Sequence, residues 1–326
     1  MSQRSVTIVD LADSLGLSKT TVADALNGSG RVSEATRSRV LEAARQRGYM
    51  ANRAAQQLRT RSVGAIGLYV PPQVRNMAFY MPFAFGAADE ASHHAWDLTL
   101  ITRWPQNGKS AHQVDGVIVI DALPGDPVVR RLIDLPIPIV TAGRNADIPP
   151  DRLAGVIEIE HERNCGIILN RLKALGASHP AFVSPVAGDD LSWSRQLQRG
   201  YKSWCRRNRS RPCLVTTPTF PSTDDVAAAV AQVLSDPDIN AVLFAWQDIA
   251  TRAAIQFEHV RAETGRSVAL ASVVSSTDHF NGTYLTALDL RPYPFGQAAA
   301  KLLHEAIAEP SDQTVYRIHE PELVEQ

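Results

Sequence analysis

The hydrophobic positions of the first fifty residues predict three short helices. Each helix follows a small polar residue that can cap its first turn and ends near a glycine. The caps are Thr7, Ser18 and Ser33, and the glycines are Gly16, Gly28 and Gly48. The apolar residues at helical spacing are Ile8, Leu11, Ala12 and Leu15, then Val22, Ala25 and Leu26, then Val40, Leu41 and Ala44. Three such helices, the first two joined by a tight glycine turn, predict a helix-turn-helix domain.

From residue 62 onward, short runs of apolar and β-branched residues alternate with helical stretches. VGAIGLYV, VDGVIVI and AVLFAW are runs of the first kind, and ERNCGIILNRLKALG is a helical stretch. This alternation predicts an α/β fold of parallel sheets with helices on both faces, and roughly 265 residues suffice for two such lobes. We therefore expect a helix-turn-helix domain over residues 1–50, a linker over 51–61 and a two-lobed core over 62–326, called the body below.

Charge is distributed unevenly along the 326 residues, although the net charge is only −1. Residues 1–61 contain ten Lys and Arg against five Asp and Glu, which gives +5. The remainder contains 23 against 29, which gives −6. A basic segment on an acidic body is typical of nucleic-acid binding.

Other classes of chemistry find little support in the sequence. There is no long apolar run for a membrane span, no apolar signal-peptide core, and no P-loop, nucleophile elbow or zinc-protease motif. We expect no cofactor and no metal, and we expect His93 and His94 to be surface residues because neighbours on a helix face apart. Three cysteines without metal spacing indicate reduced thiols and a cytoplasmic, nucleoid-associated protein.

The second predicted helix presents polar residues away from its apolar face. Helical steps of about 100° place Thr20, Asp24 and Asn27 there, with Lys19 near the N-terminal end. In a helix-turn-helix this end meets base edges in the major groove. Asp24 puts a negative charge toward a polyanion, so it either accepts a hydrogen bond from a base or pairs with a basic neighbour. The first role is favoured, because Asp24 shares the exposed face with Thr20.

The stretch VTIVDLADSLGLSKTTVADALNGSGRVSEATRSRVLEAARQRGYMANRAAQQLRTRSVGAIGLYVP resembles the head of the lactose-repressor (LacI/GalR) family almost position by position. It departs at Ala23, where the family usually has Ser. The resemblance implies that Lys19, Thr20 and Asp24 occupy the main base-reading positions. The full set of DNA-binding residues that we expect is Thr7, Ser18, Lys19, Thr20, Thr21, Asp24, Asn27, Arg31, Asn52, Arg53, Ala55, Leu58 and Arg59.

The segment NRAAQQLRT, residues 52–60, is by itself a short polar helix with Leu58 on its apolar side. It is either a linker helix packed on its neighbour or, as the resemblance implies, a hinge helix that pairs with its twin in the minor groove. In the second case Leu58 wedges between central base pairs, with Arg53 and Arg59 beside it.

The body resembles the ligand-binding core of the same family with lower specificity, in segments such as VDGVIV, IPIVTAGR and LTALDLRPYPFGQAAAKLL. The connection RWPQNGKSAHQ is shorter than the family's usual helix, and Ser272-Val273-Val274 replaces a usual Gly-Phe/Tyr-Asp. An acidic acceptor for sugar hydroxyls is therefore missing. The effector-binding residues that we expect are Phe79, Tyr80, Arg195, Trp246, Gln247 and Asp248.

Some of these residues also have a simpler interpretation. Phe79 and Tyr80 suit a dimer interface, Trp246 suits the hydrophobic core, and Arg195 suits a surface ion pair.

We interpret the sequence as a homodimeric repressor, not an enzyme, that binds palindromic double-stranded operator DNA and has no membrane partner. A small effector, sugar-like or nucleoside-like, controls it. The alternatives are a cytoplasmic sugar-binding protein and an enzyme on the same α/β core. An electrophoretic shift on palindromic DNA, set against a turnover assay, separates these classes.

Overall fold

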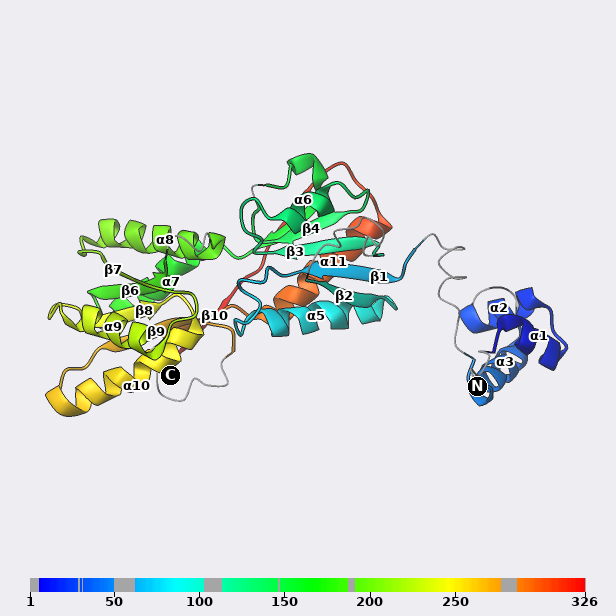
Figure 1. The fold of residues 1–326 in the computed structure, drawn as a ribbon, viewed down its shortest axis with the longest axis horizontal. Helices are drawn as coiled ribbons and strands as arrows, with labels where there is room; N and C mark the ends of the chain where they lie inside the picture. Colours follow the sequence, from blue (N-terminus) through cyan, green and yellow to red (C-terminus); the bar gives the residue numbers. More distant parts are fainter. Residues whose placement is uncertain are drawn as a thin grey trace. The chain divides into compact units, whose positions relative to one another are not determined.

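The computed structural model describes residues 6–28, 30, 32–49, 62–102, 113–145, 147–186, 191–276 and 286–325. It divides into two compact units, Met1–Val63, which we call the head, and Gly64–Gln326, the body (Figure 1). The segment predicted as a hinge, residues 52–60, and nearly all of the short connection after residue 101 lie outside the described residues. Among the described residues, no helix is long and apolar enough to cross a membrane.

The head contains three helices, α1 (Ile8–Leu15), α2 (Lys19–Asn27) and α3 (Glu34–Gln46). Each begins at the predicted cap, whose hydroxyl accepts a backbone N–H from the first turn. The residues buried between the helices are Leu11, Ala12, Val22, Ala25, Val40 and Ala44. The prediction that Leu41 faces inward is wrong, because 42% of this residue is exposed. The helical spacing predicted the buried face of α3 correctly at Val40 and Ala44 but wrongly included Leu41 in it.

The body is built on two six-stranded sheets among the described residues. In the first lobe all neighbours are parallel, in the order β11-β5-β4-β3-β1-β2. Its strands are β1 (Ala65–Tyr69), β2 (Asp97–Ile101), β3 (Gly116–Ile120), β4 (Ile139–Ala142), β5 (Leu153–Glu158) and β11 (Val315–Ile318). The buried strands β1, β3 and β4 are almost wholly apolar, as strands covered on both faces must be.

The second lobe has the order β12-β10-β9-β8-β6-β7, and only its edge strand β12 is antiparallel to its neighbour. Its strands are β6 (Pro180–Pro185), β7 (Cys213–Thr217), β8 (Ala241–Phe244), β9 (Ala269–Val274), β10 (Thr286–Asp289) and β12 (Glu322–Glu325). The predicted fold of parallel sheets flanked by helices is thus confirmed.

Helices cover both faces of each sheet, as Figure 1 shows. In the first lobe, α5 (Tyr80–His93) and α11 (Pro292–Ala308) pack together on one face, and α6 (Pro127–Ile133) lies on the other. In the second lobe, α7 (His161–Ala174) packs against α8 (Ser192–Asn208), and α9 (Thr223–Leu234) against α10 (Gln247–Thr264). A short 3-10 helix, η1 (Pro150–Arg152), leads into β5.

The pair α5 and α11 approaches closely at two glycines. A Cβ atom on Gly86 would lie 2.0 Å from the Tyr293 carbonyl oxygen, and one on Gly296 would lie 2.0 Å from the Phe83 carbonyl oxygen. Neither backbone can yield easily, so only glycine permits this crossing. Beside it, the His94 ring stacks on His304 at 3.5 Å, which makes His94 half-buried, whereas His93 is exposed as predicted.

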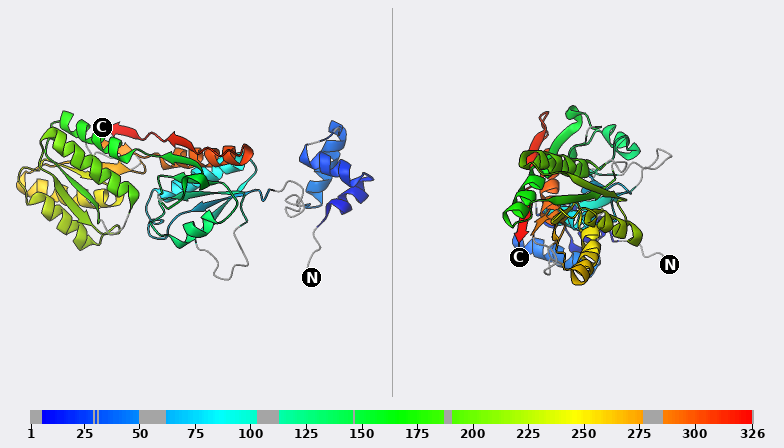
Figure 2. Two further views of the ribbon diagram at one scale, coloured as in Figure 1. Left: turned by 90° about the horizontal axis from the view of Figure 1, so that it is seen from above. Right: turned by 90° about the vertical axis from the view of Figure 1, so that its left-hand side faces the viewer.

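The chain crosses between the lobes three times: after β5, after β10 and after β11 (Figure 2). His319, on the third crossover, contacts the other two. Its backbone N–H donates to the Glu158 carbonyl at 2.8 Å, and its ring nitrogen Nε2 lies 3.1 Å from the Leu290 carbonyl. The same ring stacks on Phe295 at 4.7 Å. One residue therefore joins all three connections.

Candidate functional site

The N-terminal end of α2 carries the residues predicted to read bases. Lys19 and Thr20 are exposed there. Ser18 and Thr21 also hold the helix, because the Ser18 hydroxyl accepts the Thr21 N–H at 3.0 Å and lies 2.8 Å from the Thr21 hydroxyl. Thr7 plays the same capping part for α1 and exchanges hydrogen bonds with Asp10. The capping hydrogen bonds thus fix the starts of α1 and α2.

Asp24 does not project freely from α2. A Cβ atom built on Gly30, whose φ is +80°, would lie 2.6 Å from Asp24 Oδ2. The carboxylate therefore lies against the turn that follows α2. This position favours the role of Asp24 in shaping the turn and orienting its neighbours over a direct hydrogen bond to a base.

Several predicted DNA-binding residues lie outside the described residues. These are Arg31, Asn52, Arg53, Ala55, Leu58 and Arg59. Asn27 ends α2, but its side chain is not described. Their roles stay predictions.

The body contains a cavity lined by residues of both lobes and of the first two crossovers. Its volume is about 60 Å³. Five aromatic side chains form much of its wall: Phe79, Tyr80, Trp193, Trp246 and Phe295. Polar groups are added by Asp121, His161, Ser192, Gln196, Gln247 and Ser275. Aromatic walls with a few polar groups are typical of a small-molecule site.

Tyr80 and Asp121 form the strongest polar pair of this cavity. Tyr80, the first residue of α5, donates its hydroxyl hydrogen to Asp121 Oδ2 at 2.8 Å. Asp121 directly follows β3 and has a positive φ of 45°, which a non-glycine residue rarely adopts. Burial raises the pKa of Asp121 to about 6, although the Tyr80 hydrogen bond opposes this. The pKa of Tyr80 is raised, first by burial and then by the Asp121 charge.

His161 contributes a second titratable group. It is the first residue of α7, directly after the first crossover. Its Nδ1 atom is buried and has no hydrogen-bond partner among the described residues. Burial lowers the pKa of His161 to about 4, so the ring is neutral near pH 7. A neutral imidazole can donate or accept one hydrogen bond from a ligand.

Four of the six predicted effector residues meet in the cavity. Phe79, Tyr80, Trp246 and Gln247 line it, and the Gln247 side-chain oxygen accepts the Ser275 N–H at 3.1 Å. Trp246 is also buried, so it belongs both to the hydrophobic core and to the wall of the cavity. Val273, near the end of β9, supplies an apolar surface in the stretch that lacks the expected Asp.

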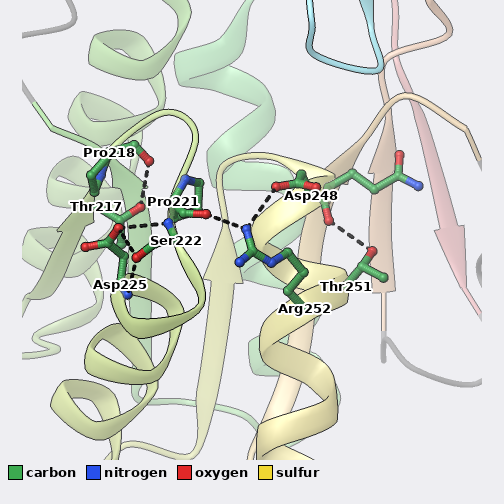
Figure 3. A network of polar contacts seen from close by, with 9 residues as sticks. Thr217, Pro218, Pro221, Ser222, Asp225, Asp248, Thr251 and Arg252 are labelled. Atoms are coloured by element: carbon green, nitrogen blue, oxygen red, sulfur yellow. Dashed lines mark hydrogen bonds and ion pairs between the residues drawn. The ribbon is translucent and has the colours of Figure 1, made fainter.

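Arg195 and Asp248 are not among the lining residues. Asp248 lies 3.8 Å from Arg252, whose guanidinium donates to the Pro221 carbonyl at 2.5 Å (Figure 3). This contact ties α10 to the segment before α9. Arg195 is exposed on α8 and borders a separate surface groove between α7 and α8.

Sequence reasoning missed Asp121, His161, Trp193 and Phe295. Asp121 directly follows a strand, and His161 lies three residues after another. The rule that sites in α/β folds form at the carboxyl ends of strands could have indicated these two. Trp193 and Phe295 lie near the starts of α8 and α11, and no local signal shows which way they point.

A helix-turn-helix head joined to a two-lobed α/β body with a ligand-type cavity defines the class of ligand-responsive, DNA-binding transcriptional regulators. Comparison with protein families agrees. Residues 7–52 match the family described as bacterial regulatory proteins, lacI family, and residues 169–326 match the periplasmic binding protein-like domain. The head thus matches the lacI family of bacterial regulatory proteins.

Individual relatives support this assignment. The regulator AglR of Rhizobium meliloti is 37% identical over 45% of this chain and 44% of its own length, so less than half of that relative is matched. The regulator CelR of Thermobifida fusca is 25% identical over 99% of this chain and 98% of its own.

Solved structures show the same fold. A CelR-cellobiose complex has a TM-score of 0.67 at 22% identity and covers 98% of both chains. The lac repressor dimer bound to operator and the anti-inducer ONPF has a TM-score of 0.77 at 18% identity and covers 99% of this chain and 98% of its own.

Proposed function

We propose that this protein is a homodimeric repressor that binds a palindromic operator through its head and releases or retains it according to a small effector bound in the body cavity. The observation that carries the proposal is the cavity itself. Both lobes contribute to its wall, and the first two crossovers pass beside it at Ile159 and Leu290. A ligand there contacts both lobes and the connections between them.

The effector is an uncharged ring compound with hydroxyl groups, most simply sugar-like. The aromatic wall offers flat apolar surface, and Gln196, Gln247 and His161 offer single hydrogen bonds. The solved CelR complex contains cellobiose, which supports a sugar-like ligand. The body acts as a binding module in this proposal and has no catalytic role.

The cavity volume of about 60 Å³ is too small for such a ligand. Ligand sites usually measure roughly 300–1,000 Å³. We therefore propose that the effector binds an arrangement in which the cavity walls stand further apart. A ligand that binds one arrangement better than the other shifts the equilibrium between them.

Exposed apolar side chains support the dimer. Met81 and Phe85, one turn apart on α5, are 53% and 58% exposed, and Leu100 on the neighbouring β2 is 52% exposed. Exposed apolar side chains that gather in this way are typical of subunit interfaces. A two-fold dimer presents two heads to a two-fold site.

The experiment begins with binding-site selection from a random duplex library, followed by titration of the selected operator with and without effector. Effectors are found by thermal shift with cellobiose, other disaccharides and nucleosides. We expect one ligand class to raise the melting temperature of wild type but not of Trp246→Ala. Phe220→Ala, an exposed aromatic away from the cavity, is the matched control and should respond like wild type. Selection of no palindrome, or an equal ligand response in Trp246→Ala, would refute the proposal.

A further inference from the structure

The body carries one strongly basic segment although its overall charge is negative. Residues 192–211, which comprise α8 and the turn after it, contain seven Lys and Arg and no Asp or Glu. The other residues of 64–326 hold 16 Lys and Arg against 29 Asp and Glu. Residues 192–211 thus carry a net charge of +7, whereas the other residues of the body carry −13.

Four of the five basic residues of α8 share one side of the helix. Arg195, Arg199, Lys202 and Arg206 follow spacings of four, three and four residues, which place them within roughly 60° of each other around the axis. They extend over about 17 Å along the axis, at ~1.5 Å per residue. All four are exposed, whereas the opposite side is buried by Trp193, Leu197, Tyr201 and Trp204.

Neighbouring acids neutralise only the start of this row. Arg199 bonds Glu162 of α7 at 3.1 Å, in the groove between α7 and α8. Further along, no carboxylate of the described residues forms an ion pair with any of five exposed cations. These are Lys202, Arg206, Arg207, Arg209 and Arg211.

A helix C-terminus favours one or two cations through its dipole. The last turn of α6 shows this ordinary arrangement with Arg130 and Arg131. The last turn of α8 also holds two, Arg206 and Arg207, but Lys202 lies before that turn and Arg209 and Arg211 follow it, so three of the five cations exceed that need. They repel each other, and an external polyanion would relieve the repulsion.

We propose that this basic surface, formed by Lys202, Arg206, Arg207, Arg209 and Arg211, is a second, sequence-independent binding surface for the phosphate backbone of duplex DNA. Four of its five residues are arginine, which suits bidentate contacts with phosphate. Protein interfaces usually have an apolar centre, yet α8 contributes no large exposed hydrophobic residue among the described residues. Interfaces with DNA are more polar and far more positive, so duplex DNA fits better than an acidic protein.

This surface lies on the body, so it acts independently of operator reading by the head. The proposed dimer would hold a second DNA segment while its two heads engage an operator. Backbone contacts of this kind strengthen as salt is lowered.

The test uses the full chain with head binding weakened by Lys19→Glu and Arg39→Glu, both exposed and without an ion pair among the described residues. In this background, Lys202→Gln, Arg206→Gln and Arg207→Gln are combined. The matched control combines Arg130→Gln, Arg131→Gln and Lys301→Gln, which remove three other exposed cations. Circular dichroism checks that both triple variants fold. The probe is a labelled 30-base-pair non-operator duplex, titrated by fluorescence anisotropy across a series of NaCl concentrations.

We expect the α8 variant to bind the duplex on the order of tenfold more weakly than its parent at low salt. The slope of log K against log salt should be less steep by about 2–3, because each lost phosphate contact reduces the slope by about 0.9. The control should match its parent. Equal isotherms for the two triple variants would overturn the proposal. The proposal would also be overturned if a poly-glutamate peptide bound the parent as tightly as the duplex does and bound the α8 variant more weakly. The surface would then suit an acidic protein.

Discussion

Tyr80 donates its hydroxyl hydrogen to Asp121 across the cavity at 2.8 Å, and it thereby links the start of α5 to the end of β3. The same cavity contains His161. Burial shifts the two titratable groups in opposite directions: it raises the pKa of Asp121 to about 6 and lowers that of His161 to about 4.

These shifts make opposite contributions to stability in acid. Between pH 6 and its ordinary pKa of 3.8, folded Asp121 keeps a proton that the unfolded chain has lost. The contribution of Asp121 to the free energy of unfolding therefore grows as pH falls. Between its ordinary pKa of 6.5 and its folded-state pKa of about 4, folded His161 stays neutral while the unfolded chain takes up a proton. The contribution of His161 to the free energy of unfolding is therefore lost as pH falls.

We therefore expect Asp121→Asn to lose stability more steeply than wild type between pH 7 and pH 4.5, and His161→Gln to lose it less steeply. Each difference should be on the order of 1–2 kcal/mol, after allowance for partial exposure to water. Asn suits the positive φ at position 121, so the first variant keeps the backbone. Urea unfolding at several pH values measures both. Parallel curves for all three proteins would contradict the assigned pKa shifts.

The close crossing of α5 and α11 predicts that Gly86→Ala destabilises the body by about 1–3 kcal/mol, because the added methyl group meets the Tyr293 carbonyl. Gly166→Ala is the control. It lies within α7, where the nearest atom to a new Cβ is 3.7 Å away, and alanine should stabilise the helix by about 0.5–1 kcal/mol. Thermal and urea unfolding of both variants would show opposite signs if the crossing requires glycine.

The end of β9 predicts weak binding of simple hexoses. Val273 lines the cavity there, and Ser272-Val273-Val274 contains no carboxylate, so a buried sugar hydroxyl lacks an acceptor at a cost of about 1–3 kcal/mol. Glucose and galactose should therefore bind poorly in calorimetry. Micromolar binding of either sugar, abolished by Trp246→Ala, would show that the cavity is an ordinary hexose site.

The hinge hypothesis predicts that Leu58→Ala weakens operator binding by a few kcal/mol and reduces DNA bending, because the minor-groove wedge is lost. The fold should be unchanged in circular dichroism. An electrophoretic bending assay measures both properties. If the variant binds and bends operator DNA like wild type, Leu58 is only a linker residue.

The contact between Asp24 and Gly30 predicts that Asp24→Ala keeps the operator consensus in a binding-site selection. Affinity for non-operator DNA should be equal or higher, because a charge that repels phosphate is gone. Asp24→Asn, which keeps the shape of the side chain, is the control for effects on the turn. Loss of preference at one base pair in each half-site would instead establish direct reading by Asp24.

The alternation of apolar runs and helices was enough to predict the fold class, and the caps of the head were read correctly from Thr7, Ser18 and Ser33. The sequence did not reveal that α11 returns to the first sheet or that β11 and β12 join different sheets. Local periodicity identifies an element, but partners far apart in the chain are chosen by tertiary packing.

The candidate site was predicted in part for a similar reason. Trp246 and Gln247 lie two and three residues after β8, where the resemblance to the family's ligand-binding core placed them correctly. Arg195 and Gln196 differ by one residue, yet only Gln196 lines the cavity. A helix turns by about 100° per residue, so the direction of each side chain depends on where α8 begins and how it packs.

The last two strands have a consequence for the order in which the protein acquires its structure. Val315–Ile318 completes the first sheet and Glu322–Glu325 completes the second. As the chain leaves the ribosome, neither lobe can close its sheet until these residues emerge, whereas the three helices of the head emerge first and pack on one another. During synthesis, a finished head thus precedes a body with two incomplete sheet edges.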